Sequence, residues 1–346
     1  MLDSTQVNAG GDGYGVITSA PVRPMALSEL RRPVEQELAA FKTYFREAMR
    51  SPVGLLDKVT QYVLRQKGKR VRPLLVLLSA KTCGEITESS YRAAALVELL
   101  HTATLVHDDV VDEADRRRGM FSINALWKNK IAVLFGDFLL SRGLLLALDY
   151  REYDLLHTVS DAVRRMSEGE LLQIEKSRLL DIDEETYFRI ISDKTASLIS
   201  ACTASGAISV TSDEEVIQCM RTVGEKLGLA FQIRDDLFDF GVADVGKPLG
   251  IDLKEKKMTL PLIYALRESP RSEQQRIMKI IKQKRKNSAD VREVAAFVEQ
   301  AGGIAYARTM MKTLAQEARS LLHQFPDSEA RQALIGLVDY TVTRTK

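Results

Sequence analysis

HTATLVHDDVVDEADRRRG, residues 101–119, ends an apolar stretch with three aspartates and three arginines. The run before them, AAALVELLHTATLV, has helix-forming residues and no Gly or Pro, which predicts a helix. Because residues three and four apart share a helix face, Asp108 and Asp112 are expected to point the same way, with Asp109 beside them. Carboxylates this close repel one another, and a hard cation such as Mg²⁺ would neutralise them. The arginines that follow suit phosphate oxygens, which a guanidinium binds in a planar fork.

A second acidic cluster repeats this spacing in LGLAFQIRDDLFDF, with Asp235, Asp236 and Asp239. Gln232 precedes it by one helical turn, and the apolar neighbours indicate a partly buried site. Buried carboxylates are costly unless they are paired or bound to metal. One cluster alone is also typical of a solvated helix end. Two such clusters, each at the end of an apolar helix, favour metal binding by both.

Composition restricts the class of protein. The 346 residues, 45% of them hydrophobic, allow one large domain with a substantial core, and a net charge of +2 gives no support for general nucleic-acid binding. The three separated cysteines, Cys83, Cys202 and Cys219, lack zinc-site spacing and predict reduced core thiols in a cytoplasmic protein. Residues 1–25, rich in Gly, Ser, Thr and Pro, are expected to be a disordered leader rather than a secretory signal, with Met25 as an alternative start.

Residues 26–346 are expected to form one all-α domain of roughly a dozen helices, since no segment alternates strictly enough for a strand. The segment 131–150 is strongly apolar but contains Asp137 and Arg142, so we expect the most buried helix rather than a membrane span. The other expected helices are 28–49 (capped by Ser28), 74–83, one from Ser89 or Ser90 to the first cluster, 153–180, 184–210, 215–240 and four more within 259–346.

Two basic segments are candidate phosphate sites. The turn at residues 67–72 precedes Pro73, where a new helix would offer free backbone N–H groups; a solubilising turn is the alternative. The loop GVADVGKPLGIDLKEKKMTLP at 241–261 is rich in Gly and basic, which is typical of a lid that closes over substrate; an ordinary polar linker is the alternative. Its lysines are Lys247, Lys254, Lys256 and Lys257.

From about Ser28 onward the chain resembles the trans-prenyltransferases, the (E)-polyprenyl diphosphate synthases. The matching segments, in the family's order, are GKRVRP at 68–73, HDDVVDEADRRRG at 107–119, GDFLL at 136–140, Lys194–Thr195, FQIRDD at 231–236 and GKPLGIDLKEKKMTLP at 246–261. The resemblance implies a single helical bundle of the isoprenoid synthase type around a deep central cavity, with the two acidic clusters facing each other across its mouth. It also implies a homodimer.

The resemblance assigns a role to each matching residue. Three Mg²⁺ ions would bridge the clusters to an allylic diphosphate, with Asp108, Asp112 and Asp235 as ligands and Asp109, Asp236 and Asp239 in support. Further partners of that diphosphate would be Arg117, Lys194, Lys247 and Lys257. An extra lid residue between Lys247 and Asp252 leaves open whether Lys256 or Lys257 reaches phosphate. Isopentenyl diphosphate, the second substrate, would bind Lys69, Arg72, His101 and Arg118.

The reaction this implies needs no protein nucleophile. Metal and basic groups would neutralise the leaving diphosphate, and an allylic carbocation would be attacked by the double bond of isopentenyl diphosphate. The cation requires nearby dipoles, for which Gln232, the Thr195 hydroxyl and the Lys194 carbonyl are suitable. The last proton can go to the released diphosphate. We interpret His107 as a packing residue or as a side chain that supports a ligand of the site.

Two small residues upstream of the first cluster predict a long product. Ala103 and Thr104 occupy positions where short-chain members often carry large aromatics, about 6–8 Å below the metals. We therefore expect an all-trans product of roughly octaprenyl length for quinone side chains. A farnesyl or geranylgeranyl diphosphate synthase is the nearest alternative. A non-catalytic subunit would be expected to have lost one cluster, and a terpene cyclase would not need GKRVRP.

Overall fold

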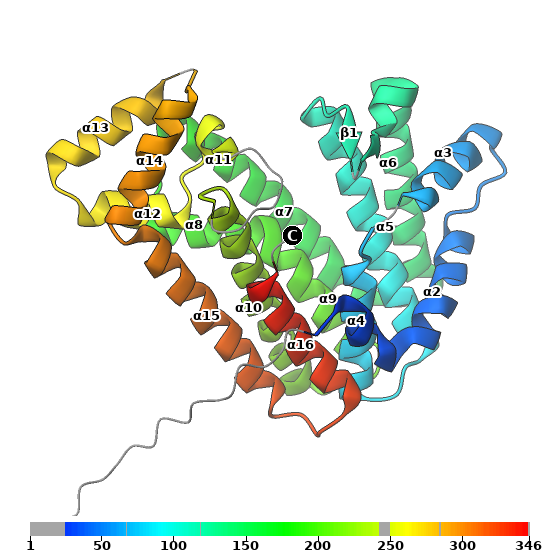
Figure 1. Cartoon of the computed structure of the whole chain (residues 1–346). Helices are drawn as coiled ribbons and strands as arrows, with labels where there is room; N and C mark the ends of the chain where they lie inside the picture. The colour runs from blue at the N-terminus through cyan, green and yellow to red at the C-terminus, as the bar shows by residue number, and fades with distance from the viewer. Residues whose placement is uncertain (1–24, 67, 118, 242–249, 284, 345–346) are drawn as a thin grey trace, which may run out of the picture.

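The computed structural model describes residues 25–66, 68–117, 119–241, 250–283 and 285–344 (Figure 1). As predicted, these residues form an all-α fold, with one short antiparallel pair, β1 (Arg116–Arg117) and β2 (Met120–Phe121). The helices are α1 (Leu27–Arg31), the 3-10 turn η1 (Arg32–Val34), α2 (Glu35–Ala48), α3 (Gly54–Arg65), α4 (Val71–Cys83), α5 (Glu88–Val111), α6 (Ile123–Asp149), α7 (Tyr153–Leu179), α8 (Glu184–Ile191), the π turn η2 (Ser192–Ala196), α9 (Ser197–Ile208), α10 (Glu214–Phe238), α11 (Ile251–Lys254), α12 (Leu260–Glu268), α13 (Arg271–Lys282), α14 (Ser288–Gln300), α15 (Gly303–Leu322) and α16 (Glu329–Thr343).

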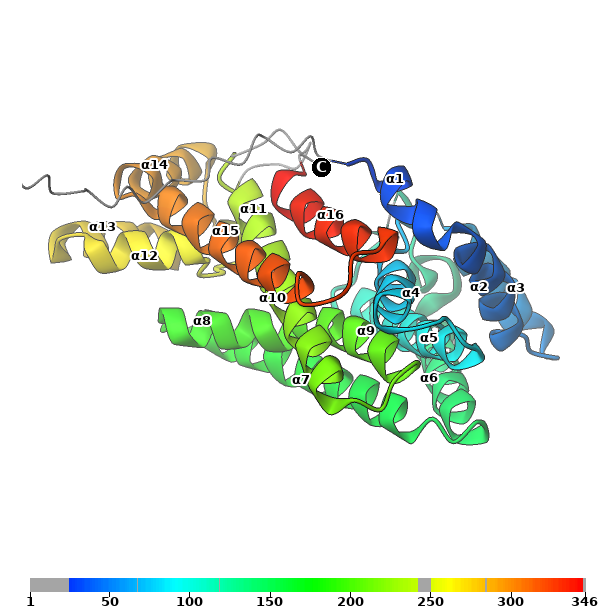
Figure 2. The same cartoon turned by 90° about the horizontal axis from the view of Figure 1, so that it is seen from below.

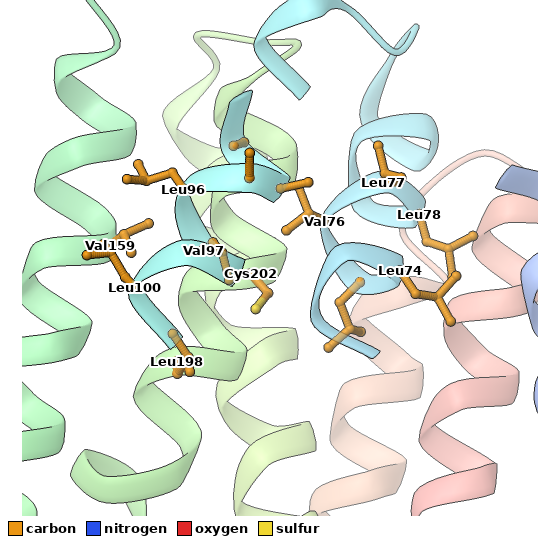
Figure 3. Close-up of a cluster of buried hydrophobic side chains, with 14 of the residues drawn as sticks. Leu74, Val76, Leu77, Leu78, Leu96, Val97, Leu100, Val159, Leu198 and Cys202 are labelled. Atoms are coloured by element: carbon orange, nitrogen blue, oxygen red, sulfur yellow. The ribbon is translucent and has the colours of Figure 1, made fainter. Parts of the chain in front are cut away.

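The bundle is organised around α9, which contacts α4, α5, α7 and α10 (Figure 2). Ten of the twelve residues of α9 are buried. Its side chains Leu198 and Cys202 belong to one apolar cluster with Leu96, Leu100 and Val159 of the surrounding helices (Figure 3). A second apolar cluster joins α10 to α12, α14 and α15.

Several predicted helix boundaries were wrong for local reasons. The expected helix 28–49 is divided into α1, η1 and α2. Pro33 lacks the N–H that a continuous helix would use, and Val34 leaves helical geometry at φ −132°. The N-cap of α1 is Ala26 rather than Ser28. Thr87 caps α5, and Ser90 lies inside the helix, where its hydroxyl accepts a hydrogen bond from the Thr87 N–H at 3.2 Å. Residues 259–344 contain five helices rather than four.

The prediction that segment 131–150 would be the most buried helix was wrong; that helix is α9. The most apolar 18-residue window of α6 is only 33% buried, and Leu134, Leu145 and Leu148 are about half exposed. By length and composition alone, α6 is the one helix among the described residues that could cross a membrane. Arg142 ties it to α2 by donating from Nε to the Ala48 carbonyl at 2.8 Å.

The three cysteines are free thiols, and only Cys202 is fully buried. Burial raises the pKa of Cys202 to about 12 and that of Cys83 to about 12, so both thiols stay protonated and unreactive at neutral pH. Their predicted role as core thiols is confirmed for Cys202. The cytoplasmic location inferred from them stays a prediction, and the expected leader lies outside the described residues apart from Met25.

Glycines allow α9 to approach its neighbours closely. A Cβ added to Gly224 of α10 would lie 2.6 Å from the Ser200 Cα and 2.2 Å from the Thr203 hydroxyl oxygen. At Gly228, one turn later, it would lie 2.5 Å from the Ala196 Cα. Backbone on the facing helix occupies the space, so a side chain at either position must push the helices apart.

We expect Gly224→Ala to lower the free energy of unfolding by about 1–3 kcal/mol, because the added methyl has no space against α9. Urea unfolding followed by circular dichroism measures this. Gly54→Ala is the matched control: a Cβ at that position would have no atom within 4 Å, so its effect should stay within about 1 kcal/mol. Equal effects of the two substitutions would contradict the close packing of α9 on α10.

Candidate active site

The first acidic cluster lies at the C-terminal end of α5, and its carboxylates face two different cavities. Asp108 and Asp112 line a cavity of about 860 Å³ together with Glu170 of α7 and Lys194. Asp109 is only 4% exposed and accepts a hydrogen bond from Arg117 Nε at 2.6 Å. The shared face expected for Asp108 and Asp112 is confirmed.

The charge on Asp108 is poorly balanced in this arrangement. Burial raises its pKa; Arg117 opposes the rise, while the carboxylates of Asp112 and Glu170 add to it. The positive charges around Asp108 therefore do not outweigh the cost of its burial. A divalent cation bound beside Asp108 would offset that cost.

The second cluster lies at the end of α10, and its three aspartates have different surroundings. Asp236 is buried and accepts hydrogen bonds from the Tyr187 hydroxyl at 2.6 Å and from Gln232 Nε2 at 2.9 Å. Burial raises its pKa to about 7 despite these two bonds. Asp235 is paired with Arg344. Asp239 is the C-cap of α10, and its carbonyl accepts from the Gly250 N–H at 3.3 Å.

A π turn brings Lys194 and Thr195 between the clusters. The expected helix 184–210 is interrupted by η2, a geometry that often marks functional sites. Lys194 forms an ion pair with Glu170 at 2.5 Å, and the Thr195 hydroxyl donates to Gln232 Oε1 at 2.9 Å. A Cβ on Gly169 would lie 2.8 Å from the backbone nitrogen of Lys194, so this glycine lets α7 pass close to the turn.

Polar and charged side chains of α7 and α10 bind the π turn. Arg165 of α7 donates from Nε to Asp193 at 2.8 Å and from Nη2 to the Ser192 hydroxyl at 2.9 Å. That hydroxyl donates in turn to Glu225 of α10 at 2.8 Å. The π turn is therefore fixed to both neighbouring helices.

Asp236 of the second cluster lines a cavity that adjoins the cavity of Asp108 and Asp112. The cavity around Asp236 shares Gln173, Ser177, Lys194 and Lys257 with the larger cavity around Asp108 and Asp112. Both Lys256 and Lys257 line the larger cavity. Lys257 also forms ion pairs with Glu255 at 2.6 Å and Asp252 at 3.5 Å. Burial lowers the pKa of Lys257, but these two carboxylates outweigh it and the net shift is upward.

The donor set fits magnesium by its chemistry. The clusters offer carboxylate oxygens, the ligands of a hard cation, and the raised pKa values of Asp108 and Asp236 are those a nearby cation would lower. Across the described residues, no three acidic, His or Cys side chains are gathered closely enough to hold an ion unaided. Magnesium usually keeps waters and binds one or two carboxylates together with substrate phosphates, so the substrate would complete the ligand set.

The basic turn lies at the start of α4, which begins at Val71 rather than at Pro73. Its N-cap, Arg70, is in the left-handed region with φ 43°. Lys69 donates from Nζ to the Tyr340 hydroxyl at 3.2 Å. Arg31 donates from Nη2 to the backbone carbonyl of Lys69. Arg72 is close enough to Cys202 for its charge to act on that thiol.

His101 and Asp109 line a small cavity beside this turn, with Arg70, Glu98 and Arg117. His101 therefore lies close to the basic turn, and it lines a different cavity from Asp108. His107 contacts α6 instead, with Nε2 at 3.3 Å from the Val133 carbonyl and 3.5 Å from Asp137. Ala103 is buried, and the Thr104 hydroxyl donates to the His101 carbonyl at 2.9 Å.

Two predicted site residues, Arg118 and Lys247, lie outside the described residues. Several side chains now at the site were missed from the sequence: Arg70, Glu98, Glu170, Tyr187, Tyr340 and Arg344. Only Arg70 carried a local signal, since it lies in the basic turn. The others come from helices whose rotation and position no spacing rule specifies.

Known proteins resemble this chain closely. The polyprenyl synthetase family model matches residues 53–298. The all-trans-nonaprenyl-diphosphate synthase (geranyl-diphosphate specific) of Rhodobacter capsulatus is 37% identical over 91% of this chain and 97% of its own. The octaprenyl diphosphate synthase of Escherichia coli strain K12 is 35% identical over 93% of this chain and 100% of its own.

Solved structures agree with the sequence matches. A decaprenyl diphosphate synthase from Rhodobacter capsulatus superposes with a TM-score of 0.87 at 35% identity, covering 93% of this chain and 100% of that one. A polyprenyl synthase from Caulobacter crescentus CB15, complexed with calcium and isoprenyl diphosphate, gives 0.84 at 33% identity over 94% of this chain and 100% of that one.

The pKa of Asp236 predicts how stability depends on pH. It is about 7 in the folded protein and about 3.9 in an unfolded chain. Between these values the folded state holds a proton that the unfolded state has lost, so the metal-free protein should lose stability as pH rises. We expect Asp236→Asn to reduce the loss between pH 5 and pH 8 by about 1–3 kcal/mol.

Urea unfolding in EDTA at the two pH values measures this difference. Asp183→Asn is the control, because hydrogen bonds from Thr186 lower the pKa of that exposed carboxyl and keep it ionised over this range. An identical loss of stability in wild type and Asp236→Asn would show that Asp236 ionises near its usual pKa.

Proposed function

The chain belongs to the polyprenyl synthetase family, and from that premise we propose that it joins an allylic diphosphate head to tail with isopentenyl diphosphate. The product is an all-trans polyprenyl diphosphate. The observation that carries this proposal is that Asp108 and Asp112 line one cavity and Asp236 lines an adjoining one. Lys194 and Lys257 line both cavities. Carboxylates for metal and lysines for phosphate at one site suit the departure of a diphosphate.

Each substrate has its own set of side chains in this proposal. Asp108, Asp112 and Asp235 would hold the metal and, with it, the allylic diphosphate. The bound metal would supply charge neutralisation to the leaving group. We propose magnesium, and three ions per site stays a prediction from the resemblance. Lys69, Arg72 and His101 would bind isopentenyl diphosphate at the start of α4, where free backbone N–H groups also favour anions.

The chemical step follows from these positions. The allylic C–O bond breaks, and its electron pair leaves with the diphosphate that Lys194 and Lys257 stabilise. The double bond of isopentenyl diphosphate then attacks the allylic cation. Thr195 and Gln232 form a hydrogen-bonded pair that supplies dipoles without a strong nucleophile. The released diphosphate takes the final proton, so no protein base is required.

A product of roughly octaprenyl length, of the kind attached to quinones, is our proposal for the chain length. Support comes from Ala103 and Thr104, which leave no large side chain one turn below Asp108. The runner-up is a short-chain synthase, since the same reaction also makes farnesyl and geranylgeranyl diphosphates. A second acidic cluster and a complete basic turn count against a non-catalytic subunit and a cyclase.

A product assay tests the proposal with full-length protein, Mg²⁺, farnesyl diphosphate and labelled isopentenyl diphosphate. We expect long-chain products, and their loss when EDTA removes the metal. Products no longer than geranylgeranyl diphosphate would support the runner-up. Turnover of the allylic diphosphate without isopentenyl diphosphate would support a cyclase.

We expect Ala103→Phe to shorten the product by several isoprene units, because an aromatic ring on α5 would block the growing chain about 7.5 Å below Asp108. Chromatography of the dephosphorylated products measures the length distribution. Ala103→Ser, which adds little volume, should leave the distribution unchanged. An unchanged product length from Ala103→Phe would show that α5 does not line the elongation cavity.

We also propose a homodimer. Support comes from α6, where Leu134 and Leu145 are 53% and 48% exposed and lie eleven residues apart on one helix face. Exposed apolar side chains on one helix face are typical of a protein–protein interface. A second copy of the chain would cover it.

We expect wild type to elute at about twice the chain mass of 38.7 kDa, and Leu134→Glu/Leu145→Glu to elute as a monomer, because charges on this face oppose burial. Size exclusion with light scattering measures the mass. Val53→Glu, at an exposed valine of the α3 N-cap, is the control and should leave the mass unchanged. A monomeric wild type would contradict the proposal.

A further inference from the structure

The C-terminal end of α16 lies against the second acidic cluster. Arg344, its C-cap, bonds from Nη2 to Asp235, and its side chain is only 12% exposed. The guanidinium lies over the Phe231 ring, 4.2 Å from the centroid, and 5.4 Å from that of Phe238. Arg234 donates to the Arg344 carbonyl from Nε at 3.2 Å and from Nη2 at 2.8 Å. Side chain and backbone of Arg344 are thus both docked on α10.

This docking gathers positive charges that repel one another. Burial lowers the pKa of Arg234, and the charges of Arg344 and Arg308 lower it further. The buried Nε of Arg344 has no hydrogen-bond partner in the described part of the chain. Asp235 is the anion that Arg344 pairs with here. A divalent ion attracts a carboxylate more strongly than one guanidinium does, so it would compete effectively for Asp235.

We propose that Arg344 is a tethered counter-ion for Asp235, which magnesium displaces when the site is loaded. The proposal rests on the function proposed above, in which Asp235 is a metal ligand. In the metal-free protein, Arg344 neutralises Asp235 and fixes the end of α16. Metal loading takes over the carboxylate and releases Arg344 from α10.

The same turn of α16 reaches the basic turn. Tyr340, one helical turn before Arg344, accepts a hydrogen bond from Lys69 Nζ at 3.2 Å and places its ring 5.7 Å from that nitrogen. The Arg344 N–H also bonds to the Tyr340 carbonyl at 2.9 Å. Release of Arg344 therefore loosens a contact of Lys69, and loading of the metal is coupled to the site for the second diphosphate.

Metal binding without turnover provides the first test. We expect Arg344→Gln to bind Mn²⁺ about three- to tenfold more tightly than wild type, measured by electron paramagnetic resonance on full-length protein without substrate, because a competing cation is gone. Arg276→Gln on α13, which removes the same charge from a surface pair with Glu273, is the control and should bind as wild type does. Unchanged or weaker binding by Arg344→Gln would overturn the proposal.

Asp235→Asn separates this proposal from the one it rests on. If that variant binds Mn²⁺ as wild type does, Asp235 is not a ligand and the proposed metal site fails. If Asp235→Asn weakens binding while Arg344→Gln leaves it unchanged, only the counter-ion role of Arg344 fails.

Hydrogen exchange of the wild-type protein tests the release directly and needs no variant. We expect the amides of residues 341–344 to exchange severalfold faster after addition of Mg²⁺ and inorganic diphosphate. The last turn of α16 would be opened by loss of the Asp235 contact. Unchanged or slower exchange in these residues would contradict displacement of Arg344.

Discussion

Carboxylates gathered in a partly desolvated cavity need positive charge close by, and the arrangement of this molecule follows from that need. Asp108, Asp112 and Glu170 face one cavity, where Lys194 forms an ion pair with Glu170. Lys256 and Lys257 line the same cavity, yet burial still raises the pKa of Asp108. A divalent cation bound there would offset the cost of burying the ionised carboxyl.

Close helix packing makes this arrangement possible. Lys194 reaches the acidic cavity because η2 departs from α-helical geometry, and η2 is held by Arg165 and Glu225 on either side. Gly169 and Gly228 let the neighbouring backbones come near enough for that hold. A core built from small residues thus sets the position of a charged group at the site.

Other side chains of the protein also bind the aspartates of the second cluster. Asp236 is satisfied by Tyr187 and Gln232, whereas Asp235 is paired with Arg344 near the chain terminus. The two aspartates are adjacent in sequence but have different partners. Their environments therefore differ in how readily each can accept a metal ion: Asp236 must give up a buried hydrogen-bond network, and Asp235 its ion pair with Arg344.

The reaction was implied by the resemblance of several motifs to a known family. Local spacing was sufficient to predict the helical class, the two acidic clusters and the basic turn. Those features depend on residues three or four apart, whose relation a helix determines. Spacing could not assign Asp109 to a different cavity from Asp108, or show that α6 exposes its leucines while α9 is enclosed. Nor could spacing predict the contact between Arg344 and Asp235, which are 109 positions apart in the chain. Such contacts arise from the rotation and packing of whole helices, which are settled by the sum of many weak contacts across the core.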